Sequence, residues 1–166
     1  MSAAGSRTRP SHPPTLFVMV GLPGSGKTTL AKELEREHDA LRLTKDDWMM
    51  ALFGWGDYRD KREVIEALLW SMGARALQLG VNVVLDYGLW ARVEREEYRA
   101  RAEALGARVD MRFLDVPEDE LLRRMEARNT RREVNDVPIT VEQLKEYLPR
   151  FQRPTEEELA SWKAIE

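Results

Sequence analysis

Short apolar runs alternate along the chain with stretches whose apolar residues recur every three or four positions. The runs predict strands at 16–20, 41–44, 81–86 and 107–114. The periodic stretches predict helices at 29–37, 48–53, 59–79, 91–105, 118–128 and 141–148. Strands that alternate with helices favour a parallel sheet covered on both faces. We therefore expect an α/β fold of three layers, with four to five parallel strands between helices.

Three segments need further description. Residues 59–79 predict a long helix with two neighbouring apolar stripes: Val64, Leu68, Met72 and Ala76 along one face, and Ile65, Leu69 and Leu77 beside them. Residues 129–137 are polar without apolar periodicity, which predicts a loop. The tail from 151 to 166 is predicted to be partly helical, or to carry a last short strand at about 162–165.

The composition fits a single soluble domain. The chain has 166 residues, of which 43% are hydrophobic and 33% charged, and no apolar run approaches the length of a membrane span. Residues 1–14 contain three prolines and no apolar core, so we expect a disordered tail before a domain at 15–166. We expect a cytoplasmic protein, because this start is not a secretory signal and cysteine is absent.

Several classes of function are disfavoured by the residue counts. With only two histidines, His12 and His38, a histidine-based catalytic triad or a zinc site is not expected. The formal net charge is −3, which weakens the case for a nucleic-acid surface, although a local basic groove is compatible with it.

The segment from Gly21 to Thr28 matches the phosphate-binding pattern G-x-x-x-x-G-K-[ST]. It lies between a predicted strand and a predicted helix, so that backbone N–H groups and the helix N-terminus surround a phosphate chain. We expect Lys27 to reach the β- and γ-phosphates and Thr28 to bind Mg²⁺. Expected nucleotide-binding residues are Gly21, Leu22, Pro23, Gly24, Ser25, Gly26, Lys27, Thr28 and Thr29. ATP is the default nucleotide, since no guanine-specifying motif is present.

Three acids follow predicted strands at the edge where the phosphate loop lies. Asp86 comes at the end of an apolar strand, where a carboxylate commonly orients Mg²⁺ together with Thr28. Asp46 or Asp47 is suited to accept the proton of an acceptor hydroxyl, while the other one caps the helix that follows.

Five arginines lie between positions 123 and 132, at the end of a predicted helix and the start of a loop. Arg124 and Arg128 are four residues apart and share a helix face, which suits a lid that clamps a transferring phosphoryl group. The alternative is a solvated face on which arginines pair with Glu118, Glu120 and Glu126.

Candidate acceptor-binding residues lie near the same edge. They are Asp47, Trp48, Tyr87, Trp90 and Arg92. The aromatic side chains suit stacking on a base or sugar, and core packing is the alternative for each. Arg92, Arg95 and Arg99 bind an anionic group of the acceptor or pair with Glu94, Glu96 and Glu103.

Over residues 15–155 the chain resembles a family of small P-loop kinases that includes phage-type polynucleotide 5′-kinases, zeta-toxin kinases and chloramphenicol phosphotransferase. Beyond the phosphate loop, the matching residues are Lys45-Asp46-Asp47-Trp48, Asp86, Asp115-Val116-Pro117, Glu120-Leu121, Arg124, Arg128 and Pro138-Ile139. The resemblance implies a P-loop NTPase fold with an arginine-bearing lid, ATP and Mg²⁺ as cofactors, Asp46 as general base and Arg128 as a catalytic arginine.

This chain departs from the family directly after Asp86, where it has Tyr87-Gly88 and the family has a Thr-Asn pair. The resemblance implies an ATP-dependent kinase that phosphorylates a hydroxyl of a small molecule such as a nucleoside, sugar or antibiotic. The alternatives are a polynucleotide 5′-hydroxyl kinase, a toxin acting on a nucleotide sugar and a nucleotide-dependent switch; the Asp46-Asp47 pair and the arginine lid speak against the switch.

Overall fold

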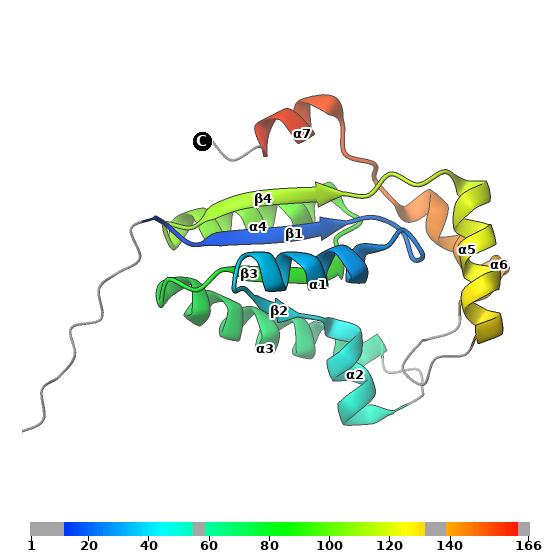
Figure 1. The fold of residues 1–166 in the computed structure, drawn as a ribbon, viewed down its shortest axis with the longest axis horizontal. Coiled ribbons are helices and arrows are strands. Elements are labelled where there is room, and N and C mark those ends of the chain that lie inside the picture. Colours follow the sequence, from blue (N-terminus) through cyan, green and yellow to red (C-terminus); the bar gives the residue numbers. More distant parts are fainter. Residues whose placement is uncertain (1–11, 55–58, 132–138, 163–166) are drawn as a thin grey trace, which may run out of the picture.

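The computed structural model describes residues 12–54, 59–131 and 139–162. Four parallel strands form one sheet in the order β2-β3-β1-β4 (Figure 1). The strands are β1 (Thr15–Val20), β2 (Leu41–Leu43), β3 (Val83–Gly88) and β4 (Arg108–Phe113). This parallel sheet confirms the predicted α/β architecture.

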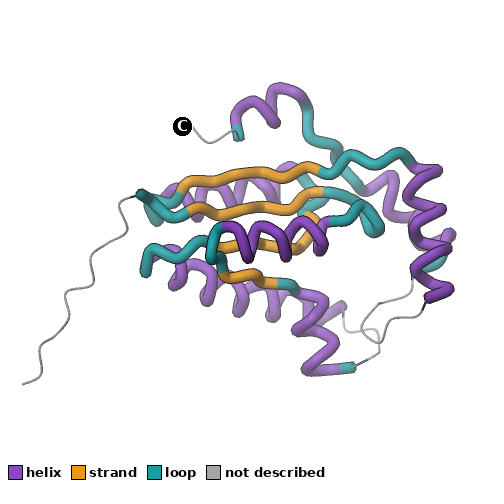
Figure 2. Tube along the Cα trace, viewed as in Figure 1, coloured by secondary structure: helices purple, strands orange, loops and turns teal. Residues whose placement is uncertain are grey.

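Helices cover both faces of the sheet (Figure 2). They are α1 (Lys27–Glu37), α2 (Lys45–Phe53), α3 (Arg59–Gln78), α4 (Arg92–Ala104), α5 (Glu118–Arg131), α6 (Val141–Tyr147) and α7 (Glu156–Ser161), with a 3₁₀ turn at Leu148–Arg150. Helix α1 packs on one face, against a cluster that includes Phe17 and Met19. Helices α3 and α4 pack on the other face, against Leu16 and Val18. Successive side chains of β1 point alternately to these two layers of helices, so both faces of the strand are apolar.

All four strands point the same way, so their carboxyl ends meet at one edge of the sheet. The loop after β1, helix α2 after β2 and the turn after β3 lie at this edge, and α5 and α6 stand beside it (Figure 1). In parallel α/β sheets this is the edge at which ligands bind.

Of the two apolar stripes of helix α3, the one with Ile65, Leu69 and Leu77 is buried. Ile65 and Leu69 are 4% and 0% exposed, whereas Val64 and Leu68 are 65% and 46% exposed. A side chain at Gly73 would begin 3.1 Å from Leu43, so this glycine brings the helix close to the sheet. Because the two stripes are adjacent on the helix, periodicity alone did not separate them.

Several boundaries also differ from the prediction. Strand β3 spans 83–88 instead of 81–86, and α2 begins at Lys45, which places Asp46 and Asp47 in its first turn. Helix α5 continues to Arg131, where a loop was expected from 129; the Thr130 hydroxyl donates to the Glu126 carbonyl within this last turn. The rest of that expected loop, from 132, lies outside the described residues.

The two ends of the chain are only partly described. Most of the tail expected at 1–14 lies outside the described residues, but the Pro14 carbonyl already accepts a hydrogen bond from Arg108 N–H at 2.8 Å. The C-terminal segment forms α7 up to Ser161, and most of the strand considered at 162–165 lies outside the described residues. Within the described part of the chain, no helix is long and apolar enough to cross a bilayer.

Candidate active site

The glycine-rich loop between β1 and α1 is held by its own backbone and by β3. Gly21 N–H donates to the Gly88 carbonyl at 3.3 Å, and Ser25 N–H donates to the Leu22 carbonyl at 3.2 Å. Gly26 precedes α1 at φ 95°, and Gly24 at φ 81° lies so close to Met125 that a Cβ would be 3.2 Å from its sulfur. Both positions therefore require glycine.

The hydroxyl of Ser25 in this loop is buried and has no hydrogen-bond partner among the described residues. Buried polar groups without partners are rare and need an explanation. An oxygen of a phosphate chain in the loop would supply the missing partner, so the loop fits the nucleotide that its sequence predicts.

Lys27 is the point at which the charged groups of the site meet. Its ammonium donates to the Leu22 carbonyl at 2.8 Å. The pKa of Lys27 is lowered to about 8, chiefly by burial and also by the positive charge of Arg128, while the negative charges of Asp86 and Asp46 act in the opposite direction. Three of the residues predicted to act with Lys27 are thus close enough to influence its charge.

Asp86 is buried in β3, at an irregularity of the sheet. Val18 of β1 pairs with Leu85, but Val20 pairs with Gly88, so β3 has one extra residue here. Such bulges often re-aim side chains next to functional sites. Burial raises the pKa of Asp86, whereas a hydrogen bond from Thr28 and the charges of Lys27 and Arg42 lower it.

Thr28 and Asp86 fit the demands of a magnesium ion. They offer a hydroxyl and a carboxylate that interact with each other, and Mg²⁺ prefers such oxygen ligands. No group of three or more carboxylates, histidines or cysteines that could enclose a metal occurs in the described ranges. The remaining ligands would be phosphate oxygens and water, which is how Mg²⁺ is usually held in phosphoryl-transfer sites.

Asp46 and Asp47 begin α2 but point to different partners. An Asp46 carboxylate oxygen lies 3.7 Å from the Arg62 guanidinium on α3, and the Asp47 carboxylate lies 3.5 Å from Arg42. Both carboxylates are exposed. Of the two acids, Asp46 is the one whose negative charge raises the pKa of both Lys27 and Asp86.

Arg42 is a site residue that sequence reasoning missed. Its guanidinium lies 3.1 Å from Glu35, 3.5 Å from Asp47 and 3.8 Å from Asp86. It also contacts the Thr44 hydroxyl, which lies 3.4 Å from Asp86. The available signal was an arginine between two leucines in a predicted strand, a position that sends it to the face opposite its neighbours.

The arginines of α5 do not all face the site. Arg128 acts on Lys27, as noted above, and is half-buried. Arg124 pairs with Glu120 at 2.6 Å on the exposed side of the helix, and Arg123 pairs with the same carboxylate. These two guanidinium groups lower the pKa of Glu120 to about 2. The pairing with Glu120 that we considered as an alternative therefore occurs at Arg123 and Arg124.

Helix α5 and the phosphate loop share an apolar cluster. Leu22 of the loop packs with Leu121 and Met125 of α5 and with Leu144 of α6. The base of the predicted lid is thus attached directly to the loop that it is expected to cover.

The predicted acceptor residues divide into two groups. Tyr87 lies under the Lys45 ammonium, which is 5.5 Å from its ring and contacts Glu66. Burial raises the pKa of Tyr87, and its buried hydroxyl has no partner among the described residues. Trp48 of α2 is half-buried and packs against the main apolar core.

Trp90 and Arg92 have other surroundings. The Trp90 ring lies 5.0 Å from Tyr147 and joins the cluster at the base of the lid. Arg92 is exposed, and its backbone N–H donates to the Gln152 side chain. Both alternatives considered for Arg95 were wrong, because this residue is buried and pairs with Glu158. Arg99 pairs with Glu103, which was one of the two alternatives considered for it.

A family model described as an AAA domain, AAA_33, matches residues 16–154. The chain belongs to the AAA_33 family. This match covers the phosphate loop, the three acids and the lid arginines together. No curated protein matches the chain in sequence.

Solved structures show how the AAA_33 chain is related in fold. A chain of the Pnkp1/Rnl/Hen1 RNA repair complex aligns with a TM-score of 0.69 and 22% identity, over 89% of this chain and 46% of that one, so our chain spans about half of it. Kti12 from Chaetomium thermophilum in complex with ADP-AlF3 aligns with a TM-score of 0.67 and 18% identity, over 86% and 82% of the two chains. A gluconokinase from Sinorhizobium meliloti 1021 aligns with a TM-score of 0.61 and 20% identity, over 88% and 79%. The AAA_33 chain therefore has the fold of the small P-loop kinases.

Proposed function

We propose that this protein is an ATP-dependent kinase that transfers the γ-phosphoryl group to a hydroxyl of a small molecule. The observation that carries the proposal is that Lys27 of the phosphate loop lies within electrostatic reach of Asp86, Asp46 and Arg128, whose charges all act on its pKa. A nucleotide-binding loop alone serves many functions, but a switch needs no carboxylate facing the loop from the side of α2. The kinase fold of the chain supports the same conclusion.

The phosphate loop and Lys27 would hold the β- and γ-phosphates. The Lys27 ammonium now bonds the Leu22 carbonyl and would turn to the phosphate oxygens. Thr28 and Asp86 would hold a magnesium ion, which neutralises charge on the β- and γ-phosphates when bound. Arg128 would stabilise the negative charge that spreads over the transferring phosphoryl group. Arg124 would join it only after releasing Glu120.

Asp46 would orient the acceptor hydroxyl and accept its proton. The acceptor oxygen forms a bond to the γ-phosphorus, the bond from that phosphorus to the β–γ bridging oxygen breaks, and ADP leaves. Asp46 suits this role because its carboxylate is exposed to an incoming acceptor and its charge acts on Lys27. It would exchange its contact with Arg62, 3.7 Å away, for the acceptor hydroxyl. Asp47 is directed to Arg42 instead.

The acceptor would lie between α2 and α3, beside the end of β3. Trp48 and Tyr87 pack on this side, and the Tyr87 hydroxyl, which has no partner among the described residues, would bond the acceptor. Asp47 is left out, because it pairs with Arg42. Trp90 and Arg92 are left out of the proposed acceptor site, because their contacts are with Tyr147 and Gln152.

A polynucleotide 5′-hydroxyl kinase is the second candidate, favoured by the similarity to a chain of an RNA repair complex. Such an enzyme contacts phosphates with lysines and arginines, so its KM for the acceptor would rise steeply with salt. A neutral small acceptor would show little such dependence.

The test is a screen of ATP consumption with Mg²⁺ against nucleosides, sugars, antibiotics and oligonucleotides with 5′-hydroxyl ends. Each hit is checked by mass spectrometry for one added phosphoryl group. Lys27→Ala should abolish transfer, and Asp46→Asn should reduce kcat by a factor of roughly 10² or more with ATP binding retained. Asp47→Asn is the matched control and should keep most of the activity. An Asp46→Asn variant with near-normal transfer would overturn the assignment of the base.

A further inference from the structure

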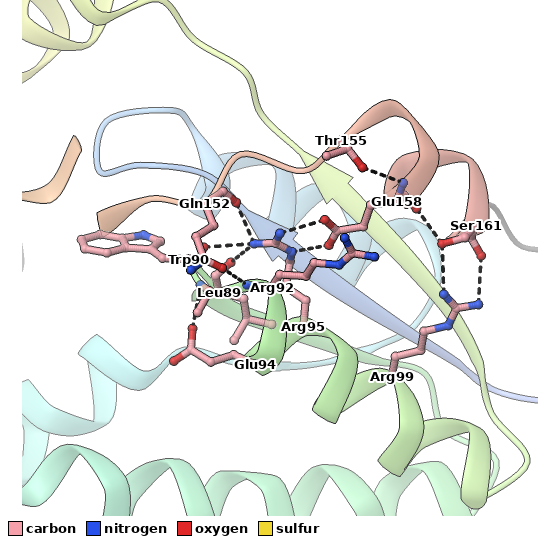
Figure 3. A network of polar contacts seen from close by, with 11 residues as sticks. Leu89, Trp90, Arg92, Glu94, Arg95, Arg99, Gln152, Thr155, Glu158 and Ser161 are labelled. Carbon is pink, nitrogen blue, oxygen red and sulfur yellow. Dashed lines mark hydrogen bonds and ion pairs between the residues drawn. The ribbon is translucent and has the colours of Figure 1, made fainter. Parts of the chain in front are cut away.

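A fully buried ion pair lies outside the phosphate site. Arg95 of α4 is 0% exposed and Glu158 of α7 is 2% exposed. The Arg95 Nε and Nη2 atoms donate to the two Glu158 carboxylate oxygens at 2.6 and 2.9 Å (Figure 3). Neither residue has a role in the proposed mechanism. A buried pair of this kind is weak evidence for stability by itself, because both charges lose hydration.

The remaining Arg95 nitrogen binds backbone instead of a second charge. Nη1 donates to the carbonyls of Leu89 at 3.2 Å, Trp90 at 3.0 Å and Gln152 at 3.0 Å (Figure 3). Gln152 N–H also donates to the Trp90 carbonyl at 3.0 Å. Arg95 therefore fastens the turn after β3 to a C-terminal segment about sixty residues further along the chain.

This turn has an unfavourable backbone conformation. Gly88 has φ 89° and the following Leu89 has φ 25°, a region that leucine rarely adopts. Such conformations persist only where surrounding contacts determine them, and they gather at functional sites. The contact from Arg95 to the Leu89 carbonyl is one that fixes this residue.

The same turn contacts the phosphate loop at two points. The Gly88 carbonyl accepts the Gly21 N–H, and a Cβ at Gly88 would be 3.3 Å from the Lys27 Cε atom. The Trp90 ring packs in the cluster that holds Leu22 of the loop and Tyr147 of the lid base. A shift of the turn would therefore displace the loop and the lid base together.

We propose that Arg95, with Glu158 as its counter-ion, is a positioning residue that sets the geometry of the nucleotide site through the turn at 88–90. It contacts neither the nucleotide nor the acceptor. The inference rests on the proposed function, since it takes the phosphate loop to bind ATP and ADP.

The chain offers a matched control for a purely structural role. Arg99 lies one turn further along α4 and also ties this helix to α7, but it bonds Glu103 and Ser161 and does not reach the turn (Figure 3). Loss of either arginine should weaken the attachment of α7. Only the loss of Arg95 should change nucleotide binding.

The experiment compares Arg95→Lys with Arg99→Lys by the melting temperature and by the dissociation constant of Mg-ADP, measured calorimetrically. Lysine has one nitrogen and does not replace five contacts. We expect Mg-ADP to bind roughly tenfold or more weakly to Arg95→Lys, and within about twofold of the parent protein to Arg99→Lys. At saturating ATP, kcat should change less than the KM for ATP.

A double variant distinguishes the effect of displacing the turn on nucleotide affinity from the effect of losing an ion pair. Arg95→Met with Glu158→Leu removes both charges, which often leaves stability unchanged or higher. It still lacks the contacts to the carbonyls, so its affinity for Mg-ADP should also fall roughly tenfold. Affinity within about twofold of the parent in either folded variant would overturn the inference. Failure of the parent protein itself to bind Mg-ADP or Mg-ATP would overturn the proposed function.

Discussion

Lys27 illustrates at the scale of one residue how function costs stability. In the unfolded chain its pKa is the ordinary 10.5, and burial lowers the pKa to about 8 in the folded protein. The unfolded state therefore binds the proton more tightly, and the folded protein is penalised at every pH below about 8. This penalty disappears as the pH rises from about 8 to above 10.5.

The prediction is that Lys27→Met does not destabilise the protein without nucleotide at pH 7. Removing the buried charge should raise the free energy of unfolding by at most about 3 kcal/mol, while binding of ATP is lost. Urea unfolding at pH 7 and pH 10 measures this, and the difference between variant and parent should shrink at the higher pH. A variant clearly less stable than its parent at pH 7 would contradict the expected sign.

Single residues also show what the sequence allowed us to predict. Asp46 was preferred to Asp47 on the family resemblance, whereas the phosphate loop, Asp86 and Arg128 were predicted from local patterns: a glycine motif, a strand end and a helical spacing. Arg42 and Arg95 were not, since their partners Asp86 and Glu158 lie more than forty residues away. Contacts that depend on how distant segments pack leave little trace in the neighbouring sequence.

At the scale of elements, α3 gives the sharpest test of the packing. Leu68 and Leu69 are neighbours of the same type, but only Leu69 is buried. Leu69→Ala should lower the free energy of unfolding by about 2–5 kcal/mol, because it leaves a cavity in the core. Leu68→Ala should change it by less than about 1 kcal/mol. Chemical denaturation of the two variants measures both values; equal losses would mean that the helix is rotated from the orientation described.

The strands were easier to predict than the faces of the helices. A parallel strand buried on both sides needs only an apolar run, as β1 and β3 show. A helix against a sheet needs a specific stripe, and in α3 two adjacent stripes are equally apolar. Which stripe is buried depends on Gly73, because this glycine lets α3 approach Leu43 of β2, and that contact exists only in the folded chain.

At the scale of the whole molecule, the C-terminal segment belongs to the core. The family match ends at 154, yet Glu158 is buried and Trp162 packs in the main apolar cluster. A variant that stops after Pro154 should lose at least about 3–5 kcal/mol, since Arg95 would remain buried without its partner. That loss is a large part of the total stability of a typical domain. Thermal unfolding of the shortened protein tests this; an unchanged melting temperature would contradict the packing of α7.

The attachment of residues 152–158 to the turn after β3 also has a consequence for biosynthesis. Domains begin to fold from the N-terminus while the ribosome is still adding residues. Strands β1, β3 and β4 can pair before the last helix has emerged, but Leu89 then lacks the full set of contacts that holds its conformation. A nascent chain would therefore acquire its sheet before the turn after β3 reaches its final geometry, and α7 would have to leave the exit tunnel before the proposed nucleotide site is complete.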